Sequence, residues 1–485
     1  MKRSSFAANA LKYGAANVLR NIASVLLLPV YTHALSPSSY GVLEIIGAIN
    51  ALMAGLFGLQ IGESLFRRLP FESEPSARHE LIVSAVALAT IANVAAILII
   101  ATLSIPLAVF FLHDKALWLY IVISSFVLFF DGFSSILLTL MRENDDSTYF
   151  FKVSIMRLIA QILFSLLALF WFKAGLVGIV IANVLVSAIS AASTVPYWPR
   201  SKSGGISWPV VRSYVQFGLP LSMAGIPGGL VASADRFFLS RLGSLSDLGI
   251  YSLANRISQT IVTLVYSPFS QAWDGKKYHA WSDSQGTLVP TAFILMNFML
   301  VFFWLVISLF SKEVIEVFSA NRFASAADVV PIITLFLIVS ANSEFVRVSI
   351  LAAGRTRTTF VIALSVLCFV VPLFALMIPF FGVRGAAMAM LLGAVFRLAV
   401  EQHISGRLNA IKLPWRRAIS MTALGATVWV CAKYSHLFSG GFFVTILIKS
   451  CLVMVFLTVI RWLNLVNHSE SRALYGGVAS FLKKS

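Results

Sequence analysis

The chain has 485 residues, of which 59% are hydrophobic and only 12% carry a charge. Soluble domains are about one quarter charged, so this composition excludes an ordinary soluble protein and indicates a membrane protein with many spans. The net charge of +17 is also compatible with nucleic-acid binding, depending on where the basic residues lie.

Apolar stretches follow one another along almost the whole chain. A membrane-spanning helix needs about 20 apolar residues. The first apolar run is too long for a cleavable signal sequence, so we interpret it as a span. The fourteen predicted spans are 9–34, 41–66, 81–112, 116–140, 152–172, 175–198, 213–240, 249–273, 287–311, 329–352, 358–381, 384–405, 416–437 and 441–463.

The basic residues are concentrated in alternate loops. With the N-terminus in the cytoplasm, 24 of the 37 lysines and arginines fall on the cytoplasmic side and seven in the opposite loops. This positive-inside bias predicts that both termini are cytoplasmic. Because the positive charge is spread over many loops, we expect no nucleic-acid partner.

The first part of the chain is similar to a later part at an offset of about 208 residues, which aligns Gly41 with Gly249 and Tyr40 with Leu248. Such self-similarity indicates a repeated architecture. Further matches at offsets of 207 to 213 are Arg142 with Arg355, Asp131 with Glu344, Gly175 with Gly382 and Gly178 with Gly385.

The repeat predicts an all-α polytopic membrane protein with two six-helix bundles. Six spans per repeat give both bundles the same orientation, as in parallel transporter repeats. We predict an N-terminal lobe over 1–199, a cytoplasmic linker over 200–212, a C-terminal lobe over 213–406, and two extra spans with a cytoplasmic tail over 407–485.

Several stretches resemble one known family. The tract from Phe217 to Ile257 contains Pro220, Asp235–Arg236 and Gly249–Ile250–Tyr251 at the positions seen in spans seven and eight of Wzx-type polysaccharide flippases. These flippases belong to the multidrug/oligosaccharidyl-lipid/polysaccharide exporter superfamily. Matching elements also lie in 26–44, 310–331 and 350–357, so the resemblance covers roughly residues 1–410.

The resemblance implies a flippase that moves undecaprenyl-pyrophosphate-linked oligosaccharides across the bacterial cytoplasmic membrane by alternating access. It implies two lobes around a central cavity, and a polysaccharide polymerase and glycosyltransferases as possible partners. The two spans after residue 410 depart from this pattern, and fourteen spans also occur in lipid II flippases. A lipid II flippase or a multidrug exporter of the same superfamily is therefore an alternative.

Four arginines are predicted to lie within spans, where an anionic headgroup would need fixed cations. Arginine suits this role because its planar fork pairs with phosphate oxygens at two points and stays charged when desolvated. The predicted cationic residues are Arg20, Arg256, Arg397 and Arg347. The alternative for each is a structural ion pair or, for Arg347 near a span end, a side chain that reaches the membrane surface.

Three acidic residues are candidates for ion coupling or charge balance: Asp131, Glu344 and Asp235. Glu344 lies three residues from Arg347 on one helix face, which favours a structural ion pair. Asp131 has no cation nearby in its own span and is the better candidate for coupling to Na⁺ or H⁺. Asp235 is followed by Arg236, with which it can pair.

Prolines and glycines interrupt the seventh span. Pro220, Pro227, Gly228 and Gly229 can weaken the backbone hydrogen bonds of the helix, so we predict a hinge there; a static kink is the alternative.

We expect no catalytic residues, metal or cofactor. The cysteines lack metal-ligand spacing and lie in apolar runs, where we expect them to pack. A membrane polymerase or ligase is the alternative from another class, but it would need a large outer loop with catalytic groups, and the longest outer loop spans about 311–328.

Overall fold

The computed structural model describes residues 26–199, 204–275, 277–282, 288–319, 321–408, 412–434 and 442–465. These residues form helices and short connections, with no β-strand among them. The described part therefore confirms the prediction of an all-α polytopic membrane protein. Arg20 lies outside the described residues.

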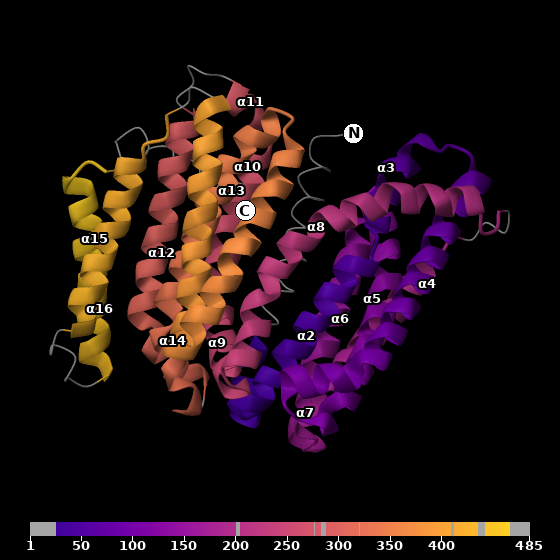
Figure 1. Cartoon of the computed structure of the whole chain (residues 1–485), viewed down its shortest axis with the longest axis horizontal. Helices are drawn as coiled ribbons and strands as arrows, with labels where there is room; N and C mark the ends of the chain where they lie inside the picture. Colours follow the sequence, from indigo (N-terminus) through magenta and orange to yellow (C-terminus); the bar gives the residue numbers. More distant parts are fainter. Residues whose placement is uncertain are drawn as a thin grey trace. The chain divides into compact units, whose positions relative to one another are not determined.

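The chain divides into two compact units, Met1–Ile250 and Tyr251–Ser485. The helices of the first unit lie close together in Figure 1. After a helical segment over 26–34, they are α2 (Pro37–Phe57), α3 (Ile61–Arg68), α4 (Pro75–Leu107), α5 (Trp118–Glu143), α6 (Ser147–Leu166), α7 (Gly175–Thr194), α8 (Trp208–Leu242) and the first residues of α9 (Leu245–Ser258).

The second unit contains the rest of α9, the π-helical turn η6 (Val262–Tyr266) and eight further elements. They are α10 (Ser267–Asp274), α11 (Lys277–Ser282), α12 (Leu288–Phe318), the 3₁₀ helix η7 (Asn321–Asp328), α13 (Val330–Ala352), α14 (Thr356–Leu408), α15 (Trp415–Tyr434) and α16 (Phe442–Trp462). Within this unit α13 packs along α14, and α15 and α16 pack beside α12 (Figure 1).

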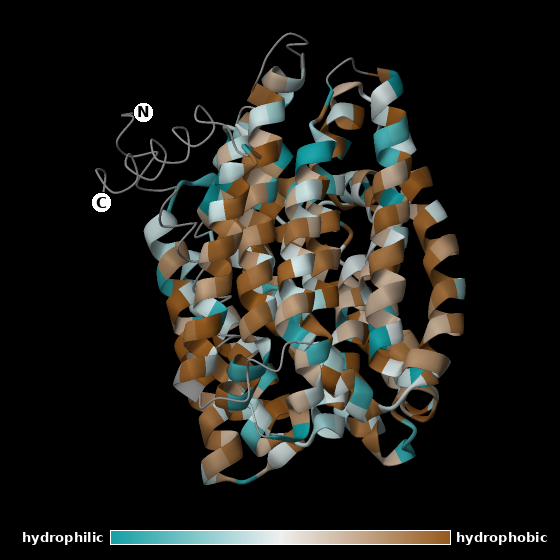
Figure 2. Cartoon of the chain, turned by 90° about the vertical axis from the view of Figure 1, so that its left-hand side faces the viewer, coloured by the Kyte–Doolittle hydropathy of each residue, from teal (hydrophilic) through white to brown (hydrophobic). Residues whose placement is uncertain are grey.

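Ten helices of the described part are long and apolar enough to cross a membrane. One of them, α14, covers the two predicted spans 358–381 and 384–405, and its backbone is non-helical between them at Gly382. Hydrophobic residues dominate the middle of the helices, and hydrophilic residues gather mostly near their ends (Figure 2). This distribution fits helices that pass through a hydrocarbon layer.

One predicted repeat match shares a backbone feature. Gly175 and Gly382 both adopt a left-handed conformation, with φ of +53° and +54°. An L-residue with a side chain rarely takes this conformation, whereas glycine takes it without steric cost. Both glycines lie where one predicted span gives way to the next, and the positive φ occurs at both positions, 207 residues apart.

Gly41 and Gly249, the pair on which the repeat was aligned, face each other in the first unit. A Cβ atom on Gly41 would lie 2.0 Å from the carbonyl oxygen of Leu245, and one on Gly249 would lie 1.9 Å from that of Pro37. Pro37 and Leu245 are themselves 208 residues apart, so the contact is symmetric in the repeat. Only glycine allows two backbones to approach this closely.

The boundary between the compact units differs from the predicted linker at 200–212. Helix α8 packs against α2, α3 and α4 of the first unit. Tyr214 of α8 is fully buried there and donates a hydrogen bond of 3.0 Å to the carbonyl oxygen of Leu81. Arg67 lies over the ring of Phe217, with its guanidinium carbon 4.3 Å from the ring centre. These contacts explain why the compact unit extends past the basic linker to Ile250.

The three cysteines are exposed, which contradicts the expectation that they pack inside the protein. Cys368, Cys431 and Cys451 lie on α14, α15 and α16, helices with many exposed apolar residues. An apolar run in a membrane protein does not distinguish a residue that faces lipid from one that faces a neighbouring helix.

Candidate functional site

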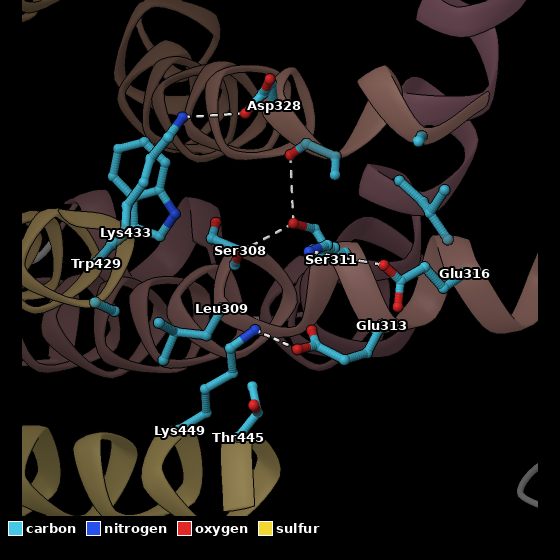
Figure 3. A pocket seen from close by; sticks show the side chains of 15 residues that line it. Ser308, Leu309, Ser311, Glu313, Glu316, Asp328, Trp429, Lys433, Thr445 and Lys449 are labelled. Atoms are coloured by element: carbon cyan, nitrogen blue, oxygen red, sulfur yellow. Dashed lines mark hydrogen bonds and ion pairs between the residues drawn. The ribbon is translucent and has the colours of Figure 1, made fainter. Parts of the chain in front are cut away.

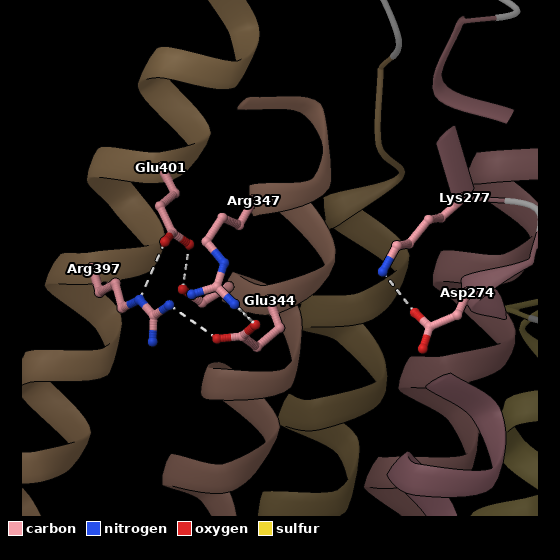
Figure 4. Close-up of polar contacts among 7 residues, drawn as sticks. Asp274, Lys277, Glu344, Arg347, Arg397 and Glu401 are labelled. Carbon is pink, nitrogen blue, oxygen red and sulfur yellow. Dashed lines mark hydrogen bonds and ion pairs between the residues drawn. The ribbon is translucent and has the colours of Figure 1, made fainter. Parts of the chain in front are cut away.

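Four charged side chains meet between α13 and α14, within the predicted tenth and twelfth spans. They are Glu344 and Arg347 on α13 and Arg397 and Glu401 on α14, and we call them the α13–α14 charge cluster (Figure 4). Charged groups within spans are costly and usually functional, so this cluster is the candidate site.

Glu344 bridges the two arginines of the cluster. Its Oε1 accepts a hydrogen bond of 2.9 Å from Nη2 of Arg397, and its Oε2 accepts one from Nη2 of Arg347. Each carboxylate oxygen thus has its own guanidinium. Two guanidinium groups around one oxyanion are also an arrangement that suits phosphate.

Glu401 anchors Arg397 from the protein interior. Its side chain is 1% exposed, and its Oε1 accepts a hydrogen bond of 3.1 Å from Nε of Arg397. Ser343 donates its hydroxyl to the other oxygen. Because a buried carboxylate needs both a counter-charge and hydrogen bonds, Glu401 fixes the position of Arg397.

The cluster is electrically balanced, with two arginines and two glutamates. The sequence predicted cations that line a cavity, whereas the structure pairs Arg347 and Arg397 with carboxylates. Glu344 and Arg347 each keep about a third of their side chains exposed. They line a cavity of about 90 Å³ that is also bounded by Tyr266 and Trp273. The anion that solvent can reach is therefore Glu344.

A second polar site lies in the first unit, where Asp131 of α5 pairs with Arg157 of α6. Nη2 of Arg157 is 2.9 Å from Oδ2 of Asp131. Asp131 also lines a cavity of about 340 Å³ together with Asn50 and Asn93. Within the described part, Oδ1 of Asp131 and Oδ1 of Asn50 are buried and have no hydrogen-bond partner.

Asp235 serves a local role in α8. It is buried, and its Oδ1 accepts a hydrogen bond of 2.8 Å from the backbone N–H of Arg236. The Arg236 side chain lies 3.5 Å from both Asp235 Oδ1 and Glu44 Oε2 of α2. Arg236 thus links Asp235 of α8 to Glu44 of α2, and the role of Asp235 stays a prediction.

The remaining predicted site residues lie elsewhere. Arg256 is half-buried in the last turn of α9. Pro220 and Pro227 lie inside α8, which is helical throughout 208–242. A Cβ on Gly228 would have no atom within 4 Å, and one on Gly229 would meet only the end of the Leu52 side chain at 3.9 Å. The hinge stays a prediction.

Sequence reasoning missed Glu401, although a signal was present. Arg397 and Glu401 are four residues apart, a spacing that brings two side chains together on one helix face. It also missed Lys449 of α16, a cation within the predicted last span, which pairs with Glu313 of α12.

The solved structures most relevant here are membrane transporters. The lipid II flippase MurJ in an inward closed conformation aligns with a TM-score of 0.75 at 15% identity, over 94% of this chain and 99% of that one. A multidrug resistance MATE family transporter of the MOP superfamily aligns in its inward-facing conformation with a TM-score of 0.64 at 15% identity, over 80% and 94%. Its outward-facing conformation gives 0.58 at 16%, over 82% and 96%.

These likenesses establish the fold, while the family follows from the sequence. No curated protein sequence matches the chain significantly. The model of the family described as "Polysaccharide biosynthesis protein" matches residues 6–273, more than half of the chain. The chain therefore belongs to the polysaccharide biosynthesis protein family and has the fold of MOP superfamily transporters.

Proposed function

We propose that this protein is a flippase that moves undecaprenyl-pyrophosphate-linked oligosaccharide across the bacterial cytoplasmic membrane by alternating access. The observation that carries the proposal is the α13–α14 charge cluster in a chain of the polysaccharide biosynthesis family. A transporter without an anionic cargo has little need for two arginines inside its spans. Both termini are cytoplasmic in this proposal.

The cluster suggests how the headgroup binds. Glu344 occupies the position between two guanidinium groups that a pyrophosphate oxygen would take. When the Glu344 side chain turns away, Arg347 and Arg397 become available to the phosphate, while Glu401 keeps Arg397 in place. The glutamate thus acts as an internal substitute for the cargo and keeps the arginines neutralised when no cargo is bound.

Replacing Glu344 with alanine is expected to tighten binding of the pyrophosphate headgroup and to slow transport. Charge-assisted hydrogen bonds contribute about 1.5–3 kcal/mol, so we expect about tenfold tighter binding or more. Binding to purified protein would be measured with a short-chain polyprenyl-pyrophosphate sugar. Glu63→Ala, an exposed carboxylate on α3, is the matched control. Equal affinity of the Glu344 variant and this control would contradict the proposal that Glu344 takes the place of the phosphate between the two arginines.

Asp131 is the proposed coupling residue. The carboxylate of Asp131 lines a cavity and could carry the coupling proton or, together with the amide oxygen of Asn50, contribute to binding a small cation. Replacing Asp131 with asparagine is expected to make transport independent of the Na⁺ or H⁺ gradient. The Asp131–Arg157 pair is about one third exposed, so its removal should lower the unfolding free energy by less than about 1 kcal/mol.

The coupling experiment compares transport with and without each gradient in reconstituted vesicles. Glu63→Gln, an exposed carboxylate on α3 of the same unit, is the control and should keep the wild-type dependence. Transport by the Asp131 variant that still follows the gradient would exclude this residue as the coupling site.

A lipid II flippase is the second candidate, because the MurJ fold spans nearly the whole chain. Mass spectrometry of lipids from a strain that lacks this protein separates the two candidates. Accumulation of an undecaprenyl-linked oligosaccharide supports the first proposal, and accumulation of lipid II supports the second. An unchanged lipid pool with an intact surface glycan would contradict both.

A further inference from the structure

A cavity of about 680 Å³ lies in the second unit, apart from the α13–α14 charge cluster, with which it shares no residue. Its walls are the last turns of α12, part of η7, the end of α15 and the first turns of α16 (Figure 3). We call it the α12–α16 pocket. All four elements contribute near a helix end, so the pocket lies at the level where these helices leave the hydrocarbon.

Six charged side chains line this pocket, three of each sign. They form three ion pairs: Lys449 with Glu313 at 2.5 Å, Lys433 with Asp328 at 3.1 Å, and Lys312 with Glu316 at 3.8 Å. An equal number of cations and anions does not favour a purely anionic ligand. It favours a ligand that carries both charges close together.

The Lys449–Glu313 pair lies deepest. The two side chains are only 10% and 12% exposed. Burying such a pair is costly, and a structural pair normally satisfies every polar atom. Here Oε2 of Glu313 and Oγ of Ser308 are buried with no hydrogen-bond partner in the described part of the chain. These two atoms beside the pocket are therefore without a hydrogen-bond partner that an ordinary structural pair would have.

Asp328 stays ionised at the rim. Burial would raise its pKa, but hydrogen bonds from Lys433 and Arg384 outweigh this and hold the pKa of the carboxyl below its usual value. Asp328 thus keeps its negative charge at neutral pH. Trp429 adds an aromatic wall, with Nζ of Lys433 5.3 Å from the ring centre.

Apolar residues are exposed on the helices that form the pocket. Val317 of α12, Val430 of α15 and Leu447 of α16 are exposed, the last with 66% of its surface accessible. A soluble sugar would gain nothing from such surroundings. A lipid would gain, because its acyl chains can lie along the apolar helix faces while its headgroup enters the polar pocket.

We propose that the α12–α16 pocket binds the headgroup of an aminophospholipid such as phosphatidylethanolamine. The ammonium group supplies N–H donors to Glu313 and its neighbouring carboxylates, and the phosphate pairs with the lysines. A choline headgroup has the same charges but no N–H donor. An anionic headgroup lacks the ammonium group, so the carboxylates would repel it. By the charge bias of the loops, the site belongs to the outer leaflet.

Delipidated full-length protein would be titrated with phosphatidylethanolamine, phosphatidylcholine or phosphatidylglycerol of identical acyl chains, and bound lipid counted by native mass spectrometry. We expect phosphatidylethanolamine to bind at least about tenfold more tightly than the other two. Equal binding of all three lipids, or preference for phosphatidylglycerol, would overturn the proposal.

Two variants test whether the lipid binds in the α12–α16 pocket. The double variant Lys449→Met with Glu313→Gln removes both charges and leaves neither buried alone, and Lys433→Gln changes only the rim. Both should reduce the preference for phosphatidylethanolamine, the double variant more strongly. Lys115→Gln, an exposed lysine of the first unit, is the control. Preference unchanged in the double variant would show that the lipid binds elsewhere.

Discussion

Replacing Gly41 with alanine is expected to destabilise the protein strongly. The added methyl group would lie 2.0 Å from the carbonyl oxygen of Leu245 and 3.2 Å from the backbone nitrogen of Gly249. Both are backbone atoms, so the clash cannot be relieved by a rotation of a side chain. Overpacking of this kind costs about 1–3 kcal/mol, and we expect the upper end of that range.

Gly47, on the same helix, provides a matched control. A Cβ on Gly47 would have no atom within 4 Å, and alanine is a better helix former than glycine by about 1 kcal/mol. Gly47→Ala should therefore leave the thermal unfolding temperature unchanged or raise it, while Gly41→Ala lowers it. Equal unfolding temperatures for the two variants would contradict the close contact.

The symmetry of the contact predicts non-additivity. Gly249→Ala places its methyl group 1.9 Å from the carbonyl oxygen of Pro37 and should cost as much as Gly41→Ala. Moving the two backbones apart once relieves both clashes. The double variant should therefore lose less stability than the two single variants lose together.

Replacing Arg397 with alanine is expected to have the second large effect. The change removes the counter-charge of Glu401, whose side chain is 1% exposed, and leaves that carboxylate with the Ser343 hydroxyl. Breaking a buried pair in this way typically costs about 3–5 kcal/mol. Arg407→Ala, at the exposed end of the same helix, should change stability little. Equal stability of these two variants would contradict the account of the cluster.

A double variant separates stability from transport. Arg397→Ala combined with Glu401→Gln no longer leaves a buried charge, so most of the lost stability should return. Transport should stay absent, because the guanidinium that we propose to bind the phosphate is missing. Wild-type transport by this double variant would show that the cluster is purely structural.

The sequence predicted structural features best at residues that the internal repeat aligns with each other. Gly175 and Gly382 share a left-handed conformation, and Gly41 and Gly249 contact each other, as equivalent positions of two related bundles would. The Glu344–Arg347 pair also followed from a spacing of three residues on one helix. These features depend on local geometry or on self-similarity, both of which are visible in a sequence.

The contacts between helices could not be predicted in this way. Arg397 meets Glu344 across 53 residues of chain, and Arg157 meets Asp131 from the next helix. Which residues meet depends on how each helix is rotated about its axis, and an apolar span contains little periodicity that reveals this rotation. Arg347 and Arg397, which were predicted to line a cavity, are found in ion pairs, the alternative that the sequence left open.

The most direct test of the flippase account is a translocation assay with the purified protein. Vesicles would carry a fluorescent undecaprenyl-pyrophosphate-linked oligosaccharide in both leaflets, and a membrane-impermeant quencher would report the fraction that reaches the outer leaflet. The account predicts that wild-type protein exposes the whole pool over time, while the stabilised double variant at Arg397 and Glu401 exposes only what protein-free vesicles do. A wild-type trace equal to that of protein-free vesicles, with the ion gradients applied, would contradict it.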